Sequence, residues 1–263
     1  EPDVEEGWRE KDFDEYVEKA KVEFKDKTTN GCFAPWMMYK DEFLGIGGHD
    51  PRFASAREDS DVFNRLVLDG FELIQSWQSF VYHLTARGGQ FQHGKLTKEH
   101  SQKSEEWQKL MNNSTREFFR KWGSQVNHTA LMMPIVSPKY DIGFVVKNCN
   151  ENLLEALEPW CSKIYIGHDF DAKHYIDREQ PNTVVDLNKK IDSIRQHKKN
   201  NDIIVTFDGS QINQQNFNFI VQLSQILAND EELEVGSFEL DIFEIEIKKI
   251  KTYENENIAC KIA

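Results

Sequence analysis

Residues 43–53 read FLGIGGHDPRF and residues 57–71 read REDSDVFNRLVLDGF, and these two stretches decide the fold that we expect. The glycine pair Gly47–Gly48 predicts a turn. The apolar spacing predicts a helix over residues 62–67 that ends at Gly70, and a strand is expected at residues 71–75. The other segments are considered by their position before or after this order of turn, acidic residues, helix and strand.

The acidic residues Glu58, Asp59 and Asp61 come directly before the apolar positions of the expected helix. One explanation is capping, because the free N–H groups and the dipole at a helix start favour negative charge. One cap needs only one acidic residue. The other explanation is catalysis, because a carboxylate can accept the proton of a substrate hydroxyl and act as a general base. The sequence leaves both explanations open.

Further candidate binding residues lie on either side of this helix. His49 and Asp50 follow the glycine pair and either contact a substrate or form an Asx turn. His83 ends an apolar run, where an imidazole either binds a divalent metal or packs in a core. Arg87 lies in a glycine-rich loop and either holds a phosphate or is exposed. Trp77 is either a stacking platform for a ring or a core residue.

The composition of the 263-residue chain limits the class of protein. A hydrophobic content of 39% with 12% aromatic residues is sufficient for folded cores. The formal net charge of -13 argues against nucleic acid or an anionic membrane as the partner, and no apolar run reaches membrane length. The four cysteines form no CxxC pair, which indicates free thiols in a reducing compartment, and we expect a cytoplasmic protein.

From residue 142 onward, apolar strands alternate with helices. Strands are expected at residues 143–147, 163–166 and 203–207, helices at 151–157, 187–196 and 217–227, and a closing strand at 238–250. The alternation predicts an α/β fold with a largely parallel sheet, as in a small Rossmann-like domain. Asp208 ends a strand in VTFDGS, a position where ligands often bind, and a turn is the alternative.

The preceding part of the chain is expected to hold a helix over residues 12–24 and a buried strand or strand-like loop over 32–39. A further helix is expected over residues 105–122, either continuous or divided near Asn112. Two prolines, Pro134 and Pro138, mark a boundary. We therefore divide the chain into a first domain at residues 1–128, a linker at 129–141 and a second domain at 142–263.

A resemblance to family 2 glycosyltransferases, the inverting enzymes of the GT-A fold, runs through three segments: APWMMYKDEFLGIGGHDPRF, REDSDVFNRLVLDGF and QSFVYHLTARG. In the acceptor-side half of that family, a Gly-Gly-(Phe/His)-Asp turn precedes an Glu-Asp-x-Asp cluster, a helix with an Arg-Leu pair and a strand that ends in His. The similarity covers about residues 30–92 and lies in the ordered combination. It implies a partial GT-A-like acceptor half with a helical extension over residues 1–128.

The resemblance implies a hexosyltransferase-type enzyme that transfers a sugar from a nucleotide-sugar donor to a saccharide acceptor with inversion. Asp59 matches the general base and Glu58 the neighbour that positions the acceptor. Arg87 is assigned to a donor phosphate, and His83 to a divalent ion, Mn or Mg, that neutralises the leaving diphosphate. The residues assigned to the acceptor are Gly47, Gly48, His49, Asp50, Asp61 and Trp77.

The sequence departs from the family because the nucleotide-binding half, with its Asp-x-Asp metal motif, should precede this segment. The chain, which begins without Met, is then the C-terminal part of a longer enzyme, or a separate N-terminal half supplies the nucleotide site, or the C-terminal α/β domain does. An alternative function is a non-catalytic carbohydrate-binding or assembly module derived from such an enzyme. A nucleotide-binding protein unrelated to sugars is the third hypothesis.

Overall fold

A six-stranded sheet forms the centre of the C-terminal part of the chain in the computed structural model, which describes residues 10–53, 56–82, 105–167, 170–196 and 198–254. The strand order is β5-β4-β3-β6-β8-β7. The first four strands are parallel, and β8 and β7 join them as an antiparallel hairpin. The bounds are β3 Ile142–Lys147, β4 Lys163–Ile166, β5 Ile191–Ser193, β6 Ile203–Asp208, β7 Gly236–Leu240 and β8 Phe243–Ile247.

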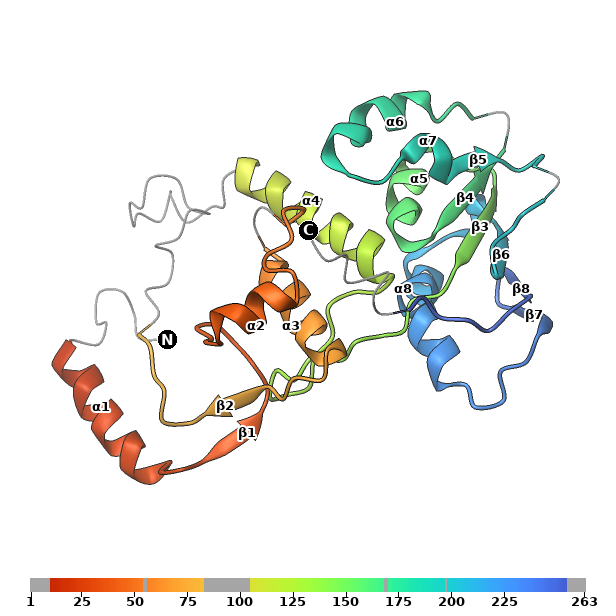
Figure 1. The fold of residues 1–263 in the computed structure, drawn as a ribbon. Helices are drawn as coiled ribbons and strands as arrows, with labels where there is room; N and C mark the ends of the chain where they lie inside the picture. Colours follow the sequence, from red (N-terminus) through yellow and green to blue (C-terminus); the bar gives the residue numbers. More distant parts are fainter. Residues whose placement is uncertain (1–9, 54–55, 83–104, 168–169, 197, 255–263) are drawn as a thin grey trace.

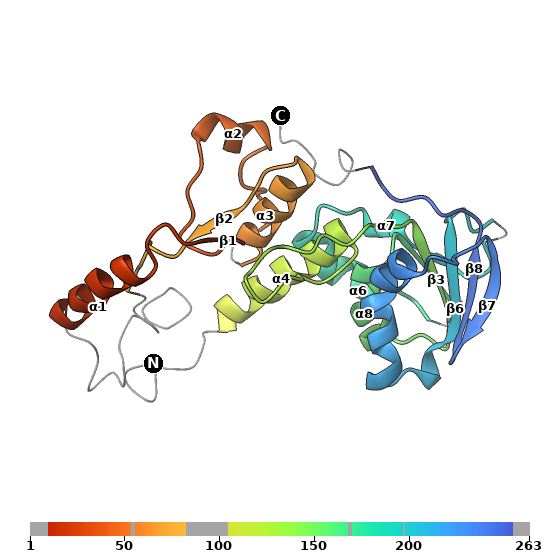
Figure 2. The ribbon, with the colours of Figure 1, turned by 90° about the horizontal axis from the view of Figure 1, so that it is seen from below.

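Helices connect these strands, as expected for parallel pairs, which need crossover connections. They are α5 Glu151–Leu157, α6 Lys173–Glu179, α7 Leu187–Lys190 and α8 Gln214–Asn229, with short 3-10 turns η3 Glu158–Trp160, η4 Gln180–Asn182 and η5 Gly209–Gln211. The predicted α/β class with a mostly parallel sheet is therefore confirmed (Figure 1, Figure 2).

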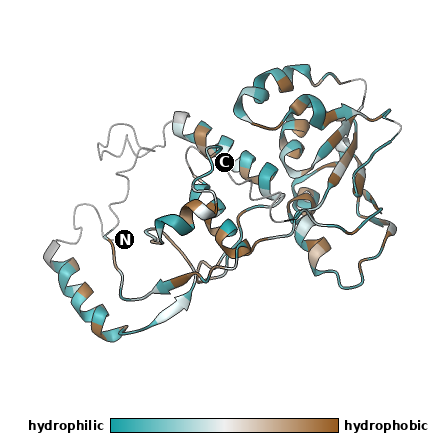
Figure 3. Ribbon diagram, viewed as in Figure 1, coloured by the Kyte–Doolittle hydropathy of each residue, from teal (hydrophilic) through white to brown (hydrophobic). Residues whose placement is uncertain are grey.

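The core of this α/β unit comes from strands that are apolar on both faces, which is typical of parallel sheets covered by helices. All of β3 except Lys147 is buried, and the brown strands of Figure 3 show this concentration of hydrophobic residues. Aromatic rings join the layers: Phe219 of α8 stacks on Phe243 of β8 at a centroid distance of 4.8 Å. Such aromatic pairs contribute beyond their buried area.

The N-terminal unit is built from short elements around a smaller core. It contains α1 Glu10–Glu23, β1 Thr28–Asn30, α2 Lys40–Gly45, α3 Glu58–Leu68 and β2 Ile74–Ser76, with β1 and β2 paired antiparallel. Its buried cluster consists of Ile46, Val62, Phe63, Leu66 and Leu73. Several large apolar side chains of this unit are exposed, with Met37 at 95% and Tyr39 at 79%.

The helix α4 Glu105–Trp122 lies between α3 and the helices α5 and α6 (Figure 1, Figure 2). Toward the α/β unit, Arg120 donates to Glu158 and to Glu179, each at 2.6 Å. Toward α3, Lys121 Nζ lies 2.6 Å from Asp61. All five side chains are buried, so α4 is fixed to both parts of the molecule by ion pairs that water does not screen.

Three expectations about local structure are corrected. Of the two alternatives for residues 32–39, a buried strand and a strand-like loop, the structure shows a loop, and it is not fully buried, since Phe33 is 60% exposed. The helix expected over 187–196 ends at Lys190, where the chain turns into β5 and pairs with β4. The strand expected over 238–250 is instead split at Asp241, which has a φ of 52° and turns the chain between β7 and β8.

One further expectation concerns the helix before the α/β unit. The helix predicted at 105–122 is continuous through Asn112 and Asn113 as α4. None of the helices in the described ranges has the length and apolarity needed to cross a membrane.

Candidate functional site

The start of α3 is shaped by two consecutive non-glycine residues in the left-handed region of the backbone. Ala56 has a φ of 64° and Arg57 a φ of 70°. Such residues cost of order 1–2 kcal/mol each and persist where the surrounding structure holds them. Here the Arg57 Nε donates to Thr115 Oγ1 of α4 at 3.2 Å. This tight turn places Glu58 and Asp59 in the first turn of the helix.

A cavity of about 240 Å³ opens at this helix start. Glu58 and Asp59 line the part of it formed by α3, here called the carboxylate wall, and a segment about seventy residues later in the chain, including Asn127 and Met132, lines another part. Apolar side chains also line the cavity, and they are here called the apolar patch. The side chains of this patch are those of Cys32, Phe33, Phe63, Val126 and Pro134.

Asp59 is oriented in this cavity by one hydrogen bond. The indole Nε1 of Trp36 donates to its Oδ1 at 3.1 Å, and no donor among the described residues reaches Oδ2. Trp36 itself is held by the rings of Phe43 and Phe63 at centroid distances of 5.9 and 5.8 Å. One carboxylate oxygen is therefore fixed while the other is available to accept a proton.

Glu58 and Cys32 also line this cavity. Oε2 of Glu58 is buried and has no hydrogen-bond partner among the described residues. A buried polar atom without a partner is costly and calls for a ligand or water. Burial, and then the charge of Asp59, raise the pKa of the Cys32 thiol to about 11. Cys32 is therefore protonated at neutral pH and is not a nucleophile, since the thiolate is the reactive form.

Asp61 and Asp50, predicted to bind an acceptor, face inward. Asp61 is fully buried and accepts from Arg65 Nε at 2.9 Å and from Trp122 Nε1 at 3.0 Å. Asp50 is 5% exposed and accepts from Lys121 at 2.8 Å. Burial alone would raise the pKa of Asp50, but hydrogen bonds from Arg52 and Lys121 outweigh it and hold the pKa well below its usual range. Neither carboxylate reaches the cavity, so the acceptor assignment of both is corrected to a structural role.

The glycine turn lies on the other side of α3 from the cavity lining. Gly47 and Gly48 have φ values of 97° and 65°, a region that glycine adopts without steric cost. Arg65 fixes the turn by donating to the carbonyl oxygens of Ile46 and Gly48, both at 2.6 Å. His49 is exposed beside Trp36 at a centroid distance of 6.3 Å. The two glycines and His49 do not line the cavity.

The remaining predicted site residues lie elsewhere. Trp77, at the end of β2, donates from Nε1 to Thr29 at 2.9 Å, and Lys27 Nζ lies 3.6 Å from its ring centroid. It therefore supports the β1–β2 ribbon and is absent from the cavity lining. His83 and Arg87 fall outside the described residues. The predictions of a metal ligand and of a donor-phosphate ligand at these two positions stay predictions.

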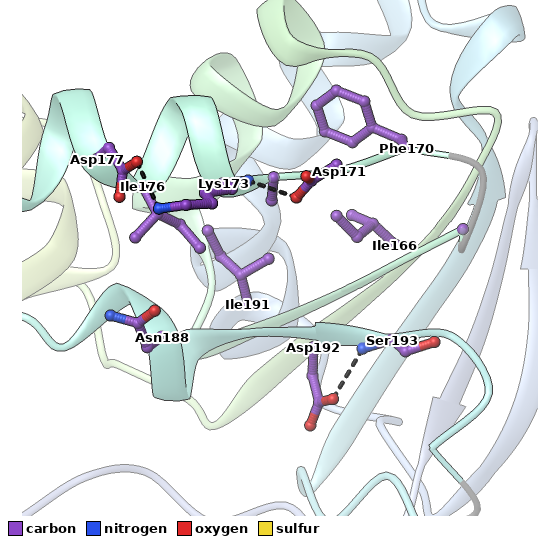
Figure 4. A pocket seen from close by; sticks show the side chains of 12 residues that line it. Ile166, Phe170, Asp171, Lys173, Ile176, Asp177, Asn188, Ile191, Asp192 and Ser193 are labelled. Atoms are coloured by element: carbon purple, nitrogen blue, oxygen red, sulfur yellow. Dashed lines mark hydrogen bonds and ion pairs between the residues drawn. The ribbon is translucent and has the colours of Figure 1, made fainter.

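A second cavity, of about 440 Å³, lies at the carboxyl ends of β4 and β5 (Figure 4). Its apolar lining residues include Ile166, Phe170, Ile176 and Ile191, which are labelled in Figure 4. Of the charged groups that line it, Lys173 lies 2.7 Å from Asp177 and Asp192 lies 2.9 Å from Lys163. Asp171 accepts from the backbone N–H of Lys173 at 2.8 Å. The lining is therefore mixed, with apolar and charged side chains.

Asp208 lies at the carboxyl end of β6, beside β3, where the strand order changes direction. Asn148 Nδ2 donates to both oxygens of Asp208, at 3.0 and 2.9 Å, and Ser210 donates to Oδ1 at 2.7 Å. These bonds lower the pKa of Asp208, so the carboxylate is charged at neutral pH. Its predicted alternative as a turn residue agrees with its bond to the Ser210 backbone N–H.

Within the described part of the chain, no three His, Cys, Asp or Glu side chains come together as a metal site. The chain was also compared with known proteins, and no family model, no curated protein and no solved structure matches it. The assignment of function therefore depends on the geometry of the two cavities.

Proposed function

We propose that the N-terminal unit, together with α4, is the acceptor-binding and general-base half of an inverting glycosyltransferase. The observation that carries the proposal is the cavity at the start of α3, which Glu58 and Asp59 both line and in which no donor among the described residues reaches Oδ2 of Asp59. The resemblance of the surrounding sequence to family 2 glycosyltransferases supports it. The substrates are a nucleotide-sugar donor and a saccharide acceptor.

In the proposed reaction, Oδ2 of Asp59 accepts the proton of an acceptor hydroxyl while the hydroxyl oxygen forms a bond to the anomeric carbon of the donor. The bond from that carbon to the nucleoside diphosphate breaks, and the diphosphate leaves with the electron pair. Trp36 orients Asp59 through its indole N–H. Glu58, which lines the same cavity, positions the acceptor beside Asp59.

The proposed reaction also requires a binding site for the nucleotide-sugar donor. The cavity at the carboxyl ends of β4 and β5 lies across α4 from α3, so a donor bound there would be separated from Asp59 (Figure 1, Figure 2). We therefore favour a separate N-terminal nucleotide-binding half over the α/β unit as the donor site of the Asp59 cavity. The divalent ion, Mn or Mg, would neutralise the leaving diphosphate, and the described residues form no site for it.

The second cavity favours an additional candidate function, nucleotide binding by the α/β unit. Open α/β sheets bind ligands outside the carboxyl ends of their strands, beside the point where strand order reverses. The sheet order β5-β4-β3-β6 creates that point between β3 and β6, and the 440 Å³ cavity lies at the carboxyl ends of the next strands, β4 and β5. Fold alone is weak support for function, so this candidate ranks second.

Two measurements test the proposals. For the first, methyl glycosides are titrated into the full chain and into Glu58→Gln and Asp59→Asn, with Asp69→Asn at the exposed end of α3 as the matched control. We expect the two cavity variants to weaken binding at least fivefold and the control to leave it unchanged. Equal affinity in all four proteins would refute the site. For the second, UDP, GDP and their sugar conjugates are titrated with and without Mn.

The alternative of a non-catalytic module is separated by turnover. When a nucleotide-binding half is added, a transferase releases nucleoside diphosphate in the presence of the acceptor, and Asp59→Asn abolishes that release. A binding module shows saccharide affinity that EDTA does not change and no release of nucleoside diphosphate with any added half.

A further inference from the structure

We infer that the hairpin at residues 127–135, here called the acceptor hairpin, determines which sugar ring the Asp59 cavity accepts, and that Asn127 is its specificity-determining residue. The inference rests on the proposed function, because it assigns the acceptor of that site. It commits to a single neutral hexopyranose ring as the group that enters the cavity.

The acceptor hairpin is a rigid element held by its own hydrogen bonds. Thr129 N donates to Met133 O at 2.9 Å and Ile135 N to Asn127 O at 2.9 Å, and Thr129 Oγ1 accepts from Met133 N at 3.1 Å. An antiparallel bridge joins His128 to Pro134. Met132, with a φ of 63°, makes the turn. A wall of this kind keeps its shape when a ligand binds, which specificity requires.

The hairpin is also fixed against the segment that precedes Trp36. Cys32 N donates to Met132 O at 3.3 Å. A Cβ at Gly31 would lie 1.8 Å from the carbonyl oxygen of Leu131, so the backbones approach as closely as only glycine permits. Backbone packing at Gly31 therefore fixes the hairpin against residues 31–32, next to the cavity-lining Cys32.

Asn127 is a hydrogen-bonding side chain of the hairpin with both of its polar atoms available to a ligand. It lines the cavity and is half-buried, and no hydrogen bond to its amide occurs among the described residues. The neighbouring His128 already uses Nδ1 on the carbonyl oxygen of Thr129 at 2.9 Å. An amide carries both a donor and an acceptor, and can therefore distinguish the orientation of a ring hydroxyl.

The size and charge of the cavity define the ring. A volume of about 240 Å³ lies below the ~300–1,000 Å³ of pockets for drug-sized ligands, so one ring fits and an oligosaccharide must extend outward. The apolar patch of Cys32, Phe33, Phe63, Val126 and Pro134 matches the apolar face of a pyranose. The lining holds two carboxylates, Glu58 and Asp59, and one arginine, Arg57, whose Nε already donates to Thr115, so a uronate would be repelled.

The test measures epimer selectivity by titrating methyl glucoside, methyl galactoside, methyl mannoside and methyl glucuronide into the full chain. We expect the wild-type protein to prefer one neutral epimer and to bind the glucuronide at least fivefold more weakly than that epimer. Asn127→Ala should reduce the ratio of affinities between the preferred and the other epimers by about five- to tenfold, the worth of one neutral hydrogen bond. Gln125→Ala, exposed and outside the cavity, is the matched control and should keep the ratio.

The outcomes separate this inference from the function on which it rests. If Asp59→Asn abolishes glycoside binding but Asn127→Ala leaves the epimer ratio unchanged, the inference is wrong and the proposed function stands. Preference for the glucuronide also overturns it. If no glycoside binds the wild-type chain, both are wrong.

Discussion

The cavity at the start of α3 and the buried ion-pair clusters along α4 use the same kind of side chain for opposite purposes. Asp59 and Asp61 are two residues apart on one helix, yet Asp59 has a free oxygen facing a cavity while Asp61 is neutralised by Arg65 and Lys121. The buried Glu158 is likewise surrounded by Arg120 and Lys190. A carboxylate that binds substrate must keep one oxygen without a partner. In a carboxylate that joins two elements, both oxygens must accept from donors.

The strongest test of this contrast is removal of Arg120 from the cluster on α4. Arg120→Ala leaves the buried carboxylates of Glu117, Glu158 and Glu179 without their shared cation. We expect the free energy of unfolding to fall by about 3–5 kcal/mol. Urea denaturation measures it, and Lys173→Ala, which breaks an exposed pair with Asp177, should leave the midpoint unchanged. A loss of unfolding free energy below about 1 kcal/mol would show that the ion pairs of Arg120 contribute little to stability.

The pH dependence of stability gives a second test. Burial of Glu158 favours the neutral acid, but Lys190 and Arg120 outweigh it and lower the pKa from its ordinary value of 4.5 to about 2. Because the folded-state pKa is depressed, the stability is present above pH 4.5 and is lost as the pH falls toward 2. The loss amounts to roughly 3 kcal/mol. Glu158→Gln should flatten this part of the profile, and an unchanged slope would contradict the assignment.

Asp59 and Asp61 allow the same contrast, between a carboxylate with a free oxygen and a paired one, to be tested within one helix. Asp61→Asn removes a charge from between Arg65 and Lys121 and should lower the free energy of unfolding by roughly 2–3 kcal/mol. Asp59→Asn should change it by less than about 0.5 kcal/mol. Calorimetric unfolding and glycoside titration of both variants measure the difference. If Asp59→Asn proved the more destabilising of the two, Asp59 would be a structural residue.

The smallest expected effect comes from the backbone that precedes Glu58. Ala56→Gly replaces a side chain held at a φ of 64° and should raise the free energy of unfolding by up to about 1 kcal/mol. Ala156→Gly, exposed in the helix α5, is the matched control and should lower it by about 1 kcal/mol. A loss of stability in both variants would mean that the turn at Ala56 is not strained.

Much of the α/β unit was predictable because its signals are local. The strands β3, β4 and β6 and the helices α5 and α8 follow from apolar runs and their spacing. The helix predicted over 187–196 was wrong because its residues after Lys190 pair with β4, and strand pairing is a tertiary effect that helical spacing does not reveal. The hairpin of β7 and β8 was missed because its turn, at Asp241, carries no glycine.

Of the residues that line the candidate site, the sequence predicted only the carboxylates Glu58 and Asp59. Glu58 and Asp59 were found because acidic residues cluster before a helix, but the same pattern also selected Asp61, which is buried. Burial depends on Lys121 and Trp122, sixty residues away in the sequence. The acceptor hairpin, with Asn127, was not predicted as part of the site. The approach of this hairpin to Cys32 depends on long-range packing against Gly31.

The outer strand of the sheet has a consequence for how the protein behaves at high concentration. β7 pairs with β8 along one edge, all five of its residues are exposed, and Phe238 and Leu240 are among them. An open edge of this kind is a template for association between chains, and charge is what opposes it. The net charge of -13 vanishes near the isoelectric point of about 5.1. We therefore expect aggregation to begin at this edge as a solution is acidified toward pH 5, well before Glu158 is protonated.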